Sequence, residues 1–297
     1  PPPPPPPPSL PPKPVPVPLP VPVPAPAPPP TPALSVMPTP PAYGGIGSCV
    51  IWGDPHIRTF DGMRADYYSS GEYWLVKSDT IWIQARYLPT KFTNGLAVTK
   101  ILAIGGPVLK GNKLLIAPTF ATWNSARVLA GFPSHFEQPD LVHLDYDSAG
   151  ALVDTALDAS KKHIVHAHIF DGSPEGIMVQ VNRWLATKGE EYINAKITMH
   201  SRPGQDGHCG NFNGQAADDD RLAVRDRVGK TGVPQDQLLF ASKTPITVAD
   251  RPDINDCPTA TLEAAKADCK ATFGGESPKM SCLLDYCFAG KDVAVAQ

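Results

Sequence analysis

Proline is concentrated at one end of this chain and limits what that end can form. Of the 37 prolines in 297 residues, 24 precede Gly44, and the first eight residues are all proline. Proline fixes φ and pushes the preceding residue toward extended geometry, so alternation such as Val15-Pro16-Val17-Pro18 favours polyproline II. At ~3.1 Å per residue, residues 1–32 would span roughly 100 Å. We predict a stiff stalk over residues 1–44, which cannot build a hydrophobic core.

Three interpretations of this stalk are open. It can be a semi-rigid spacer, or a ligand for the aromatic-lined grooves of SH3 or WW readers, which are intracellular. The poly-proline, Val-Pro and Ala-Pro tracts also resemble the hydroxyproline-rich glycoproteins of plant and green-algal walls. That resemblance, which we favour, implies hydroxylated prolines carrying O-linked glycans. No Asn-x-Ser/Thr acceptor sequence occurs, so any glycosylation is expected to be O-linked.

Charge and hydropathy exclude two classes of partner. The formal net charge of -3 lacks the basic excess that nucleic-acid binding requires. No apolar run is long enough to cross a bilayer, so we expect no membrane span. The chain begins with proline and no leader precedes it, so either a leader was removed or this is a piece of a longer chain.

The cysteines indicate an oxidising compartment. There are six, an even and widely spaced set without a CxxC pair, which disfavours zinc knuckles and thioredoxin-type sites. Disulfides are therefore expected, in a secreted or cell-surface protein. The alternative is six buried free thiols. The six are Cys49, Cys209, Cys257, Cys269, Cys282 and Cys287.

Between Cys49 and about His200 the sequence is typical of short antiparallel strands. Aromatic and β-branched runs are separated by Gly, Pro, Asn and Asp clusters, and Asp79-Thr80 parts two runs as a hairpin turn does. We predict a mostly β fold, an antiparallel β-sandwich. The expected strands are 72–76, 81–87, 98–104, 113–116, 127–130, 141–146, 163–169, 176–181 and 192–199.

Two motifs bracket this β body. Gly53-Asp54-Pro55-His56 through Phe60-Asp61-Gly62 opens it, and His208-Cys209-Gly210-Asn211-Phe212-Asn213-Gly214 followed by Asp218-Asp219-Asp220 closes it. In order and separation they resemble the signatures of the von Willebrand factor type D domain of mucins and other secreted adhesion proteins. The resemblance covers roughly Cys49 to Asp220, and we assign a type D-like domain to residues 45–225. Gly71-Glu72-Tyr73 lacks the cysteine that the family usually has there.

The resemblance implies a disulfide and a calcium site. Cys49 is expected to pair with Cys209, which would tie the first strand to the end of the body. The expected calcium ligands are side chains of both motifs. Asn, Asp and Gly are also what an ordinary solvated turn uses, but hard oxygens around a sharp glycine turn are typical of calcium loops. The ligands implied are Asp61, Asn211, Asn213, Asp218 and Asp219.

The sequence offers little catalytic chemistry. The Asp54-Pro55 bond is the one candidate, because an aspartate can attack its own carbonyl while proline leaves, and some mucin-type relatives cleave there. A structural turn is the alternative that we favour. Neither a Gly-x-Ser-x-Gly elbow nor a phosphate-cradling glycine loop occurs, so no enzymatic activity is expected.

Histidines on one expected strand suggest a second metal site. His166 and His168 would project from one face of the strand, near His163, at a pitch that suits two zinc ligands. His143 could supply a third ligand. Solvent-facing histidines on a half-buried strand are the simpler interpretation.

The C-terminal residues 226–297 are expected to form a linker and a small helical module. A helix after Pro258, capped by Thr259 or Thr261, would place Leu262, Ala265 and Cys269 on one face. Residues 281–288 resemble the Cys-x-x-Asp-x-Cys string of the cysteine-rich module that often follows type D domains. Such a module needs disulfides because its core is small, and four cysteines allow three pairings.

We therefore expect an extracellular structural or adhesion glycoprotein subunit of a filament, cell wall, flagellar surface or matrix. Its expected partners are other matrix proteins or copies of itself. The alternatives are a self-cleaving module at Asp54-Pro55 and a lectin-like surface domain. The latter would need an exposed aromatic cluster, for which the candidates are Trp52, Trp74, Trp82, Trp123 and Trp184.

Overall fold

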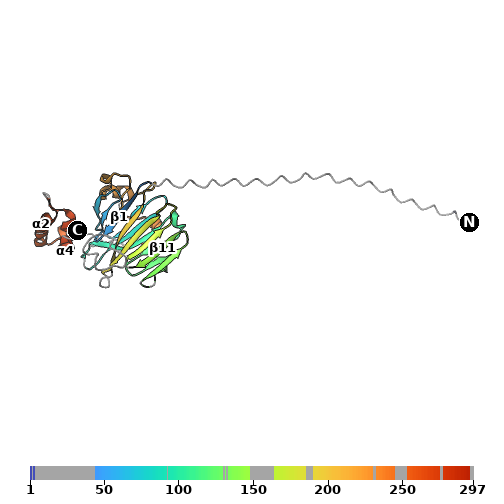
Figure 1. The fold of residues 1–297 in the computed structure, drawn as a ribbon, viewed down its shortest axis with the longest axis horizontal. Helices are drawn as coiled ribbons and strands as arrows, with labels where there is room; N and C mark the ends of the chain where they lie inside the picture. The colour runs from blue at the N-terminus through green and yellow to red at the C-terminus, as the bar shows by residue number, and fades with distance from the viewer. Residues whose placement is uncertain are drawn as a thin grey trace. The chain divides into compact units, whose positions relative to one another are not determined.

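The computed structural model describes residues 1, 3, 44–91, 93–129, 131, 133–147, 164–184, 190–229, 232–244, 253–274 and 277–294. The chain divides into two units, Pro1–Thr39 and Pro40–Gln297. The stalk predicted as polyproline II lies, apart from two prolines, outside the described residues. All the helices and strands below belong to the second unit (Figure 1).

Within the described residues, the larger sheet has eight antiparallel strands in the order β10-β11-β12-β13-β14-β1-β2-β3. Strand β1 pairs with β14, so the first and last strands of the body lie side by side in the interior of the sheet. The strands are β1 (Ile46–Trp52), β2 (His56–Arg58), β3 (Arg64–Asp66), β10 (Ser134–Gln138), β11 (Val142–Asp147), β12 (Ile164–Ile169), β13 (Ile177–Trp184) and β14 (Tyr192–His200).

The second sheet has six antiparallel strands in sequence order, from β4 to β9, among the described residues. Its strands follow one another as a meander, which is the simplest way to connect antiparallel neighbours. They are β4 (Gly71–Lys77), β5 (Trp82–Pro89), β6 (Ala97–Gly105), β7 (Leu114–Ile116), β8 (Ala121–Trp123) and β9 (Ala126–Arg127).

One hydrophobic core lies between the two sheets. It joins Ile51 and Val179 of the larger sheet to Ile83 and Leu102 of the smaller one, all fully buried. Burial of each such aliphatic side chain stabilises the fold by about 1.5–3 kcal/mol. The predicted mostly β, antiparallel sandwich is thus confirmed.

Most predicted runs coincide with observed strands, and Ser78 to Ile81 turn between β4 and β5 as expected. The strand predicted over 127–130 is wrong, because of its described residues only the first, Arg127, lies in a strand, β9. The short strands β2, β3 and β8 were not predicted. β2 and β3 have three residues each, too few for a period of two to stand out. Strand β10, Ser134–Gln138, has an edge position and no buried residue, so it lacks an apolar signal.

The outer face of the smaller sheet is covered by residues 232–244, part of the region expected to be a linker. Leu239 and Phe240 pack with Trp74 and Ala103 in a separate apolar cluster. Gln84 anchors this segment, because its side chain donates to Gln237 O and accepts from Leu239 N. A short 3-10 turn, η3 (Gln235–Gln237), lies within it.

Helix α1 (Arg221–Val228) was not predicted, since the residues after Asp220 were interpreted as a polar connector. Asp220 caps it by accepting hydrogen bonds from Leu222 N and Ala223 N. Only Val224 is buried, so the helix lacks the apolar stripe on which sequence reasoning depends. Two further 3-10 turns are η1 (Pro107–Leu109) and η2 (Ala216–Asp218).

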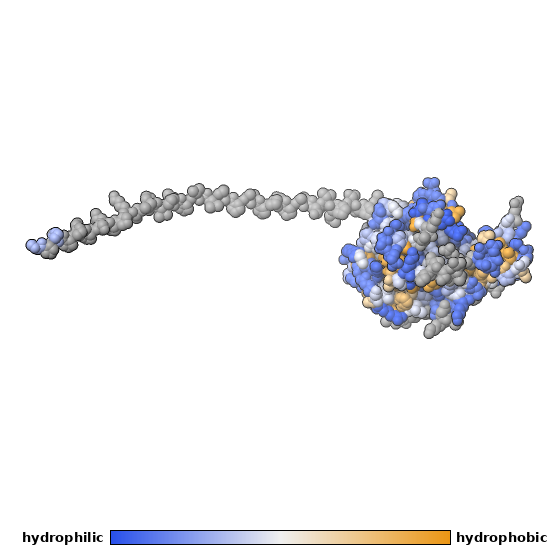
Figure 2. Space-filling model, turned by 180° about the vertical axis from the view of Figure 1, so that it is seen from behind, coloured by the Kyte–Doolittle hydropathy of each residue, from blue (hydrophilic) through white to orange (hydrophobic). Residues whose placement is uncertain are grey.

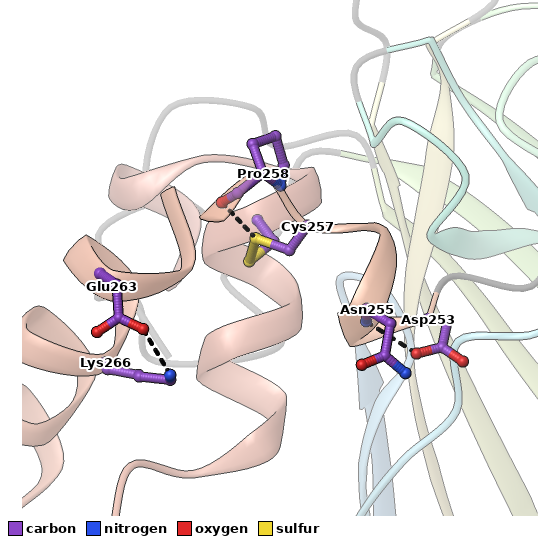
Figure 3. Close-up of a disulfide and its surroundings, with 7 residues drawn as sticks. Asp253, Asn255, Cys257, Pro258, Glu263 and Lys266 are labelled. Atoms are coloured by element: carbon purple, nitrogen blue, oxygen red, sulfur yellow. Dashed lines mark hydrogen bonds and ion pairs between the residues drawn. A yellow bond between two sulfur atoms is a disulfide. The ribbon is translucent and has the colours of Figure 1, made fainter. Parts of the chain in front are cut away.

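The C-terminal module contains η5 (Ile254–Asp256), α2 (Thr259–Phe273), α3 (Met280–Phe288) and α4 (Lys291–Ala294). Disulfides Cys257–Cys287 and Cys269–Cys282 staple it, which selects one of the three possible pairings. Figure 3 shows Cys257 between the Asp253–Asn255 turn and the start of α2.

Helix α2 differs from its prediction in one detail and agrees in another. The N-cap position is Pro258, without a side-chain hydrogen bond, so the expected threonine cap is wrong. Ala265 and Cys269 are buried and Leu262 packs against them, as the predicted shared face requires.

The face drawn in Figure 2 carries scattered apolar residues among hydrophilic ones. In the part of the chain that the structure describes, no helix has the length and apolarity needed to cross a membrane.

Candidate functional site

The segment after β14 closes the β body onto its beginning. His208 N and Cys209 N donate to the carbonyls of Trp74 and Leu75, while Phe60 N donates to Cys209 O. Gly207 is required at the start of this closing segment, because it has φ +132° and a Cβ there would lie 2.5 Å from Leu75 O. The two sequence motifs therefore meet in space.

A disulfide joins the same two regions. Cys49 of β1 is bonded to Cys209, and both residues are fully buried. This is the pairing that the family resemblance implies. All six cysteines of the chain are paired.

The five side chains expected to bind calcium lie together at this junction. Asp61 accepts hydrogen bonds from Asn213 N at 3.0 Å and Gly214 N at 2.9 Å. Asp218 Oδ2 accepts from the side-chain amides of Asn211 and Asn213 at 3.1 and 2.8 Å. Asp219 Oδ1 accepts from Asn211 N at 3.0 Å. Carboxylates of both motifs thus hydrogen-bond to the same short loop, residues 211–214.

Two carboxylate oxygens of this group are buried without hydrogen-bond partners among the described residues, Asp218 Oδ1 and Asp219 Oδ2. Asp219 is fully buried, and burial raises the pKa of its carboxyl. The side-chain amide of Asn213, followed by that of Asn211, lowers the pKa of Asp218. Buried carboxylate oxygens without donors are the groups that a hard cation would satisfy.

Gly210 packs directly against the side chain of Asp219. A Cβ at Gly210, where φ is +85°, would lie 2.0 Å from Asp219 Oδ2. Arg227 lies on the other side, with Nη2 3.5 Å from Asp219 Oδ1 and a 2.6 Å ion pair to Asp206. With three carboxylates, two amide side chains and one nearby arginine, this oxygen cluster fits the donor set of a calcium site.

A buried histidine lies beside the oxygen cluster and was not predicted. His208 stacks on Tyr67 with ring centroids 3.6 Å apart, and its Nδ1 is 3.3 Å from Tyr87 Oη. Burial lowers the pKa of His208 to about 3, so the imidazole is neutral in the folded protein at neutral pH. The signal available in the sequence was its place directly before Cys209.

Residues of the opening motif form a second buried cluster. Asp54 and Pro55 are buried, and Asp54 Oδ1 lies 3.1 Å from His56 Nε2. His56 Nδ1 is 2.7 Å from Asp66 Oδ1. The sequence did not indicate the fourth member, Asp285 of helix α3, whose Oδ2 is 3.5 Å from His56 Nε2.

The ionisable groups around His56 shift one another's pKa values. Burial alone would lower the pKa of His56, but the hydrogen bonds with Asp54 and Asp66 and the charges of Asp54 and Asp285 raise it to about 10. Burial, reinforced by the charge of Asp54, raises the pKa of Asp285 far above its usual range.

The family model of the von Willebrand factor type D domain matches residues 49–88. This match begins within β1 and ends within β5, so it contains the opening motif and Cys49, and it supports a protein with a type D domain. It ends before the closing motif. No curated protein matches the chain. A type D domain and three disulfides fit an extracellular protein.

Among the described residues, the histidines suggested as zinc ligands do not form a group of three ligands within reach of one ion. His143 and His168 are cross-strand partners, but His143 pairs with Asp145 and His168 contacts Glu175 O. His163 lies outside the described residues. Among the described His, Cys, Asp and Glu side chains, only Asp54, His56 and Asp285 bring three ligand atoms within 4.8 Å of one another, so the carboxylates of the oxygen cluster are more widely spaced than that.

The candidate tryptophans supply no exposed cluster within the described side chains. Trp74 and Trp123 are buried, and Trp82 packs beneath residues 232–244. The side chain of Trp184 lies outside those described.

Proposed function

We propose that this chain is a non-enzymatic subunit of an extracellular filament, cell wall or surface matrix. In this proposal a calcium-stabilised type D-like domain is carried on a rigid, O-glycosylated stalk of hydroxylated prolines. Its partners are other matrix proteins or further copies of the chain.

The observation that carries this proposal is the meeting of the two motifs at one oxygen-rich, disulfide-closed junction. The Cys49–Cys209 bond holds the closing segment, and Asp61 receives the backbone N–H groups of Asn213 and Gly214. A divalent cation there would neutralise Asp61, Asp218 and Asp219, whose mutual repulsion otherwise opposes closure. We infer that calcium strengthens a domain that must persist outside the cell.

The extracellular part of the proposal is tested by intact mass spectrometry of native, non-reduced protein, with peptide mapping of residues 1–44. We expect added oxygen atoms and pentose or hexose units on the stalk, and no free thiol. An unmodified stalk together with free cysteines would contradict it.

A second candidate function is self-cleavage at Asp54-Pro55. The favouring observation is the buried contact of 3.1 Å between Asp54 and His56, which places a proton donor beside the carboxylate. Mild acid treatment followed by reducing electrophoresis separates the candidates. Two fragments meeting at Asp54-Pro55 would support cleavage, and one intact band supports the structural role.

A further inference from the structure

Four ionisable side chains from distant parts of the second unit meet in one buried cluster. Asp54 and His56 come from the β1–β2 turn and strand β2, Asp66 ends β3, and Asp285 lies in the middle of α3. Asp54 is 3 % exposed, His56 5 % and Asp285 0 %. The cluster therefore joins the β body to the disulfide-stapled helical module.

Most of the polar atoms facing one another here make no hydrogen bond. Asp54 Oδ2, His56 Nε2 and both carboxylate oxygens of Asp285 are buried and make no hydrogen bond of good geometry among the described residues, although Nε2 lies 3.1 Å from Asp54 Oδ1 and 3.5 Å from Asp285 Oδ2. Leaving such a group unsatisfied costs about 1–3 kcal/mol, and more for charged groups. Four of them in one place indicate a ligand that accepts electron pairs.

The charge balance points to a cation. Asp54, Asp66 and Asp285 surround one imidazole, so ionising all three carboxyl groups would leave negative charge in excess even with His56 protonated. When Asp54, Asp285 and a neutral His56 bind a divalent ion, the two carboxylate charges balance the charge of the ion. Buried charges are stable when they are paired or coordinate a metal.

The spacing of the donor atoms suits a small ion. His56 Nε2 lies 3.1 Å from Asp54 Oδ1 and 3.5 Å from Asp285 Oδ2. Two ligands of a tetrahedral zinc ion, each bonded at about 2.0–2.1 Å, lie about 3.3 Å apart. The three ligand atoms all fall within 4.8 Å of one another.

The donor types select zinc over calcium. An imidazole nitrogen with two carboxylates is typical of zinc and its neighbours in the first transition row, while calcium takes oxygen ligands. Asp66 completes the pattern, because its 2.7 Å contact with Nδ1 leaves Nε2 free to ligate. A carboxylate in this outer position orients the histidine in many zinc sites.

We propose that Asp54, His56 and Asp285 bind one zinc ion that fastens the C-terminal helical module to the β body. The module presents Asp285 rigidly, since Cys282 and Cys287 on either side of it are both disulfide-bonded. A second contact, Asn94 Nδ2 donating to Phe288 O at 2.8 Å, aligns the same helix. A zinc-bound Asp54 carboxylate is also withheld from attack on its own carbonyl.

The test is calorimetric titration of zinc into the untagged, disulfide-intact full chain, with calcium in excess to occupy the oxygen cluster. We expect one zinc ion per chain with micromolar or tighter affinity. Asp285→Asn and His56→Asn should weaken binding at least 100-fold, and Asp66→Asn by about 10–100-fold, as loss of an outer carboxylate does. Asp256→Asn, an exposed acid of the same module, is the matched control and should bind as the parent does.

X-ray absorption of the zinc-loaded parent protein gives a measurement that needs no variant. Nitrogen and oxygen ligands, with one imidazole and no sulfur, support the proposal. Sulfur ligation, absence of micromolar zinc binding by the parent, or parent-like binding by Asp285→Asn would overturn it. Asp219→Asn should still bind zinc, which separates this site from the calcium cluster.

Discussion

Asp61 Oδ2 accepts a hydrogen bond from Asn213 N over 3.0 Å, although the two residues are 152 positions apart. The contact joins the opening and closing motifs, which the resemblance had paired only by their order in the sequence. It lies beside the buried carboxyl of Asp219. The beginning and the end of the β body therefore converge on the same group of side-chain oxygens.

The glycine beneath Asp219 allows the oxygen cluster to be tested without removing a ligand. Gly210 and Gly214 both have φ +85°, but a Cβ would strike Asp219 Oδ2 only at Gly210, and it meets nothing within 4 Å at Gly214. We predict that Gly210→Ala and Gly214→Ala each lower the free energy of unfolding by about 1 kcal/mol, because alanine is strained at this φ. In Gly210→Ala, overpacking against Asp219 should lower the free energy of unfolding by about 1–3 kcal/mol more. This variant should also no longer be stabilised by calcium.

The measurement is urea unfolding of both variants in calcium and in EDTA. Gly214→Ala supplies the matched control because its φ is the same. Equal behaviour of the two variants in calcium would show that Asp219 has no part in binding the ion.

The disulfides should differ in what they stabilise. Cys49–Cys209 closes a loop of sequence separation 160, and Cys269–Cys282 one of 13. Replacing Cys49 and Cys209 by serine should lower the free energy of unfolding of the β body by about 5 kcal/mol in the chain-entropy model. Replacing Cys269 and Cys282 should cost about 3 kcal/mol and act on the helical module.

Tryptophan fluorescence during urea unfolding follows the β body, and hydrogen exchange follows the helices. Comparable loss of β-body stability in the two double variants would contradict this assignment.

His208 should make the β body sensitive to acid. Its folded pKa of about 3 lies below the unfolded value of 6.5, so between these pH values only the unfolded chain takes up the proton. The stability it contributes is complete above pH 6.5 and is lost as the pH falls toward 3. At about 1.4 kcal/mol per pH unit, roughly 2 kcal/mol is lost between pH 6.5 and 5.

His208→Gln isolates this effect from other groups, including Asp285, whose raised pKa acts in the opposite direction. The difference in unfolding free energy between parent and variant should shrink by that amount between pH 6.5 and 5. A difference that stays constant with pH would contradict a neutral, buried His208.

The sequence was informative where a pattern repeats or a motif is contiguous. Strands such as 192–199 could be predicted from the alternation of apolar and polar residues, because one face of the strand packs against the core. Helix α1 was hidden because it buries only Val224, although Asp220 at its N-cap was a usable signal. The clusters of His208 and His56 depend on residues brought together by the sheets, and no local pattern could place Asp285 beside Asp54.

The most direct test of the account is thermal and urea unfolding of the parent and of the Asn211→Ala/Asp219→Ala variant, each in calcium and in EDTA. We predict that calcium at 100 times its dissociation constant stabilises the parent by about 2.7 kcal/mol and the variant not at all. In EDTA the two should unfold alike, and Asp226→Asn, an exposed acid of helix α1, should respond to calcium as the parent does. Equal unfolding of parent and variant in calcium would contradict a calcium-stabilised junction.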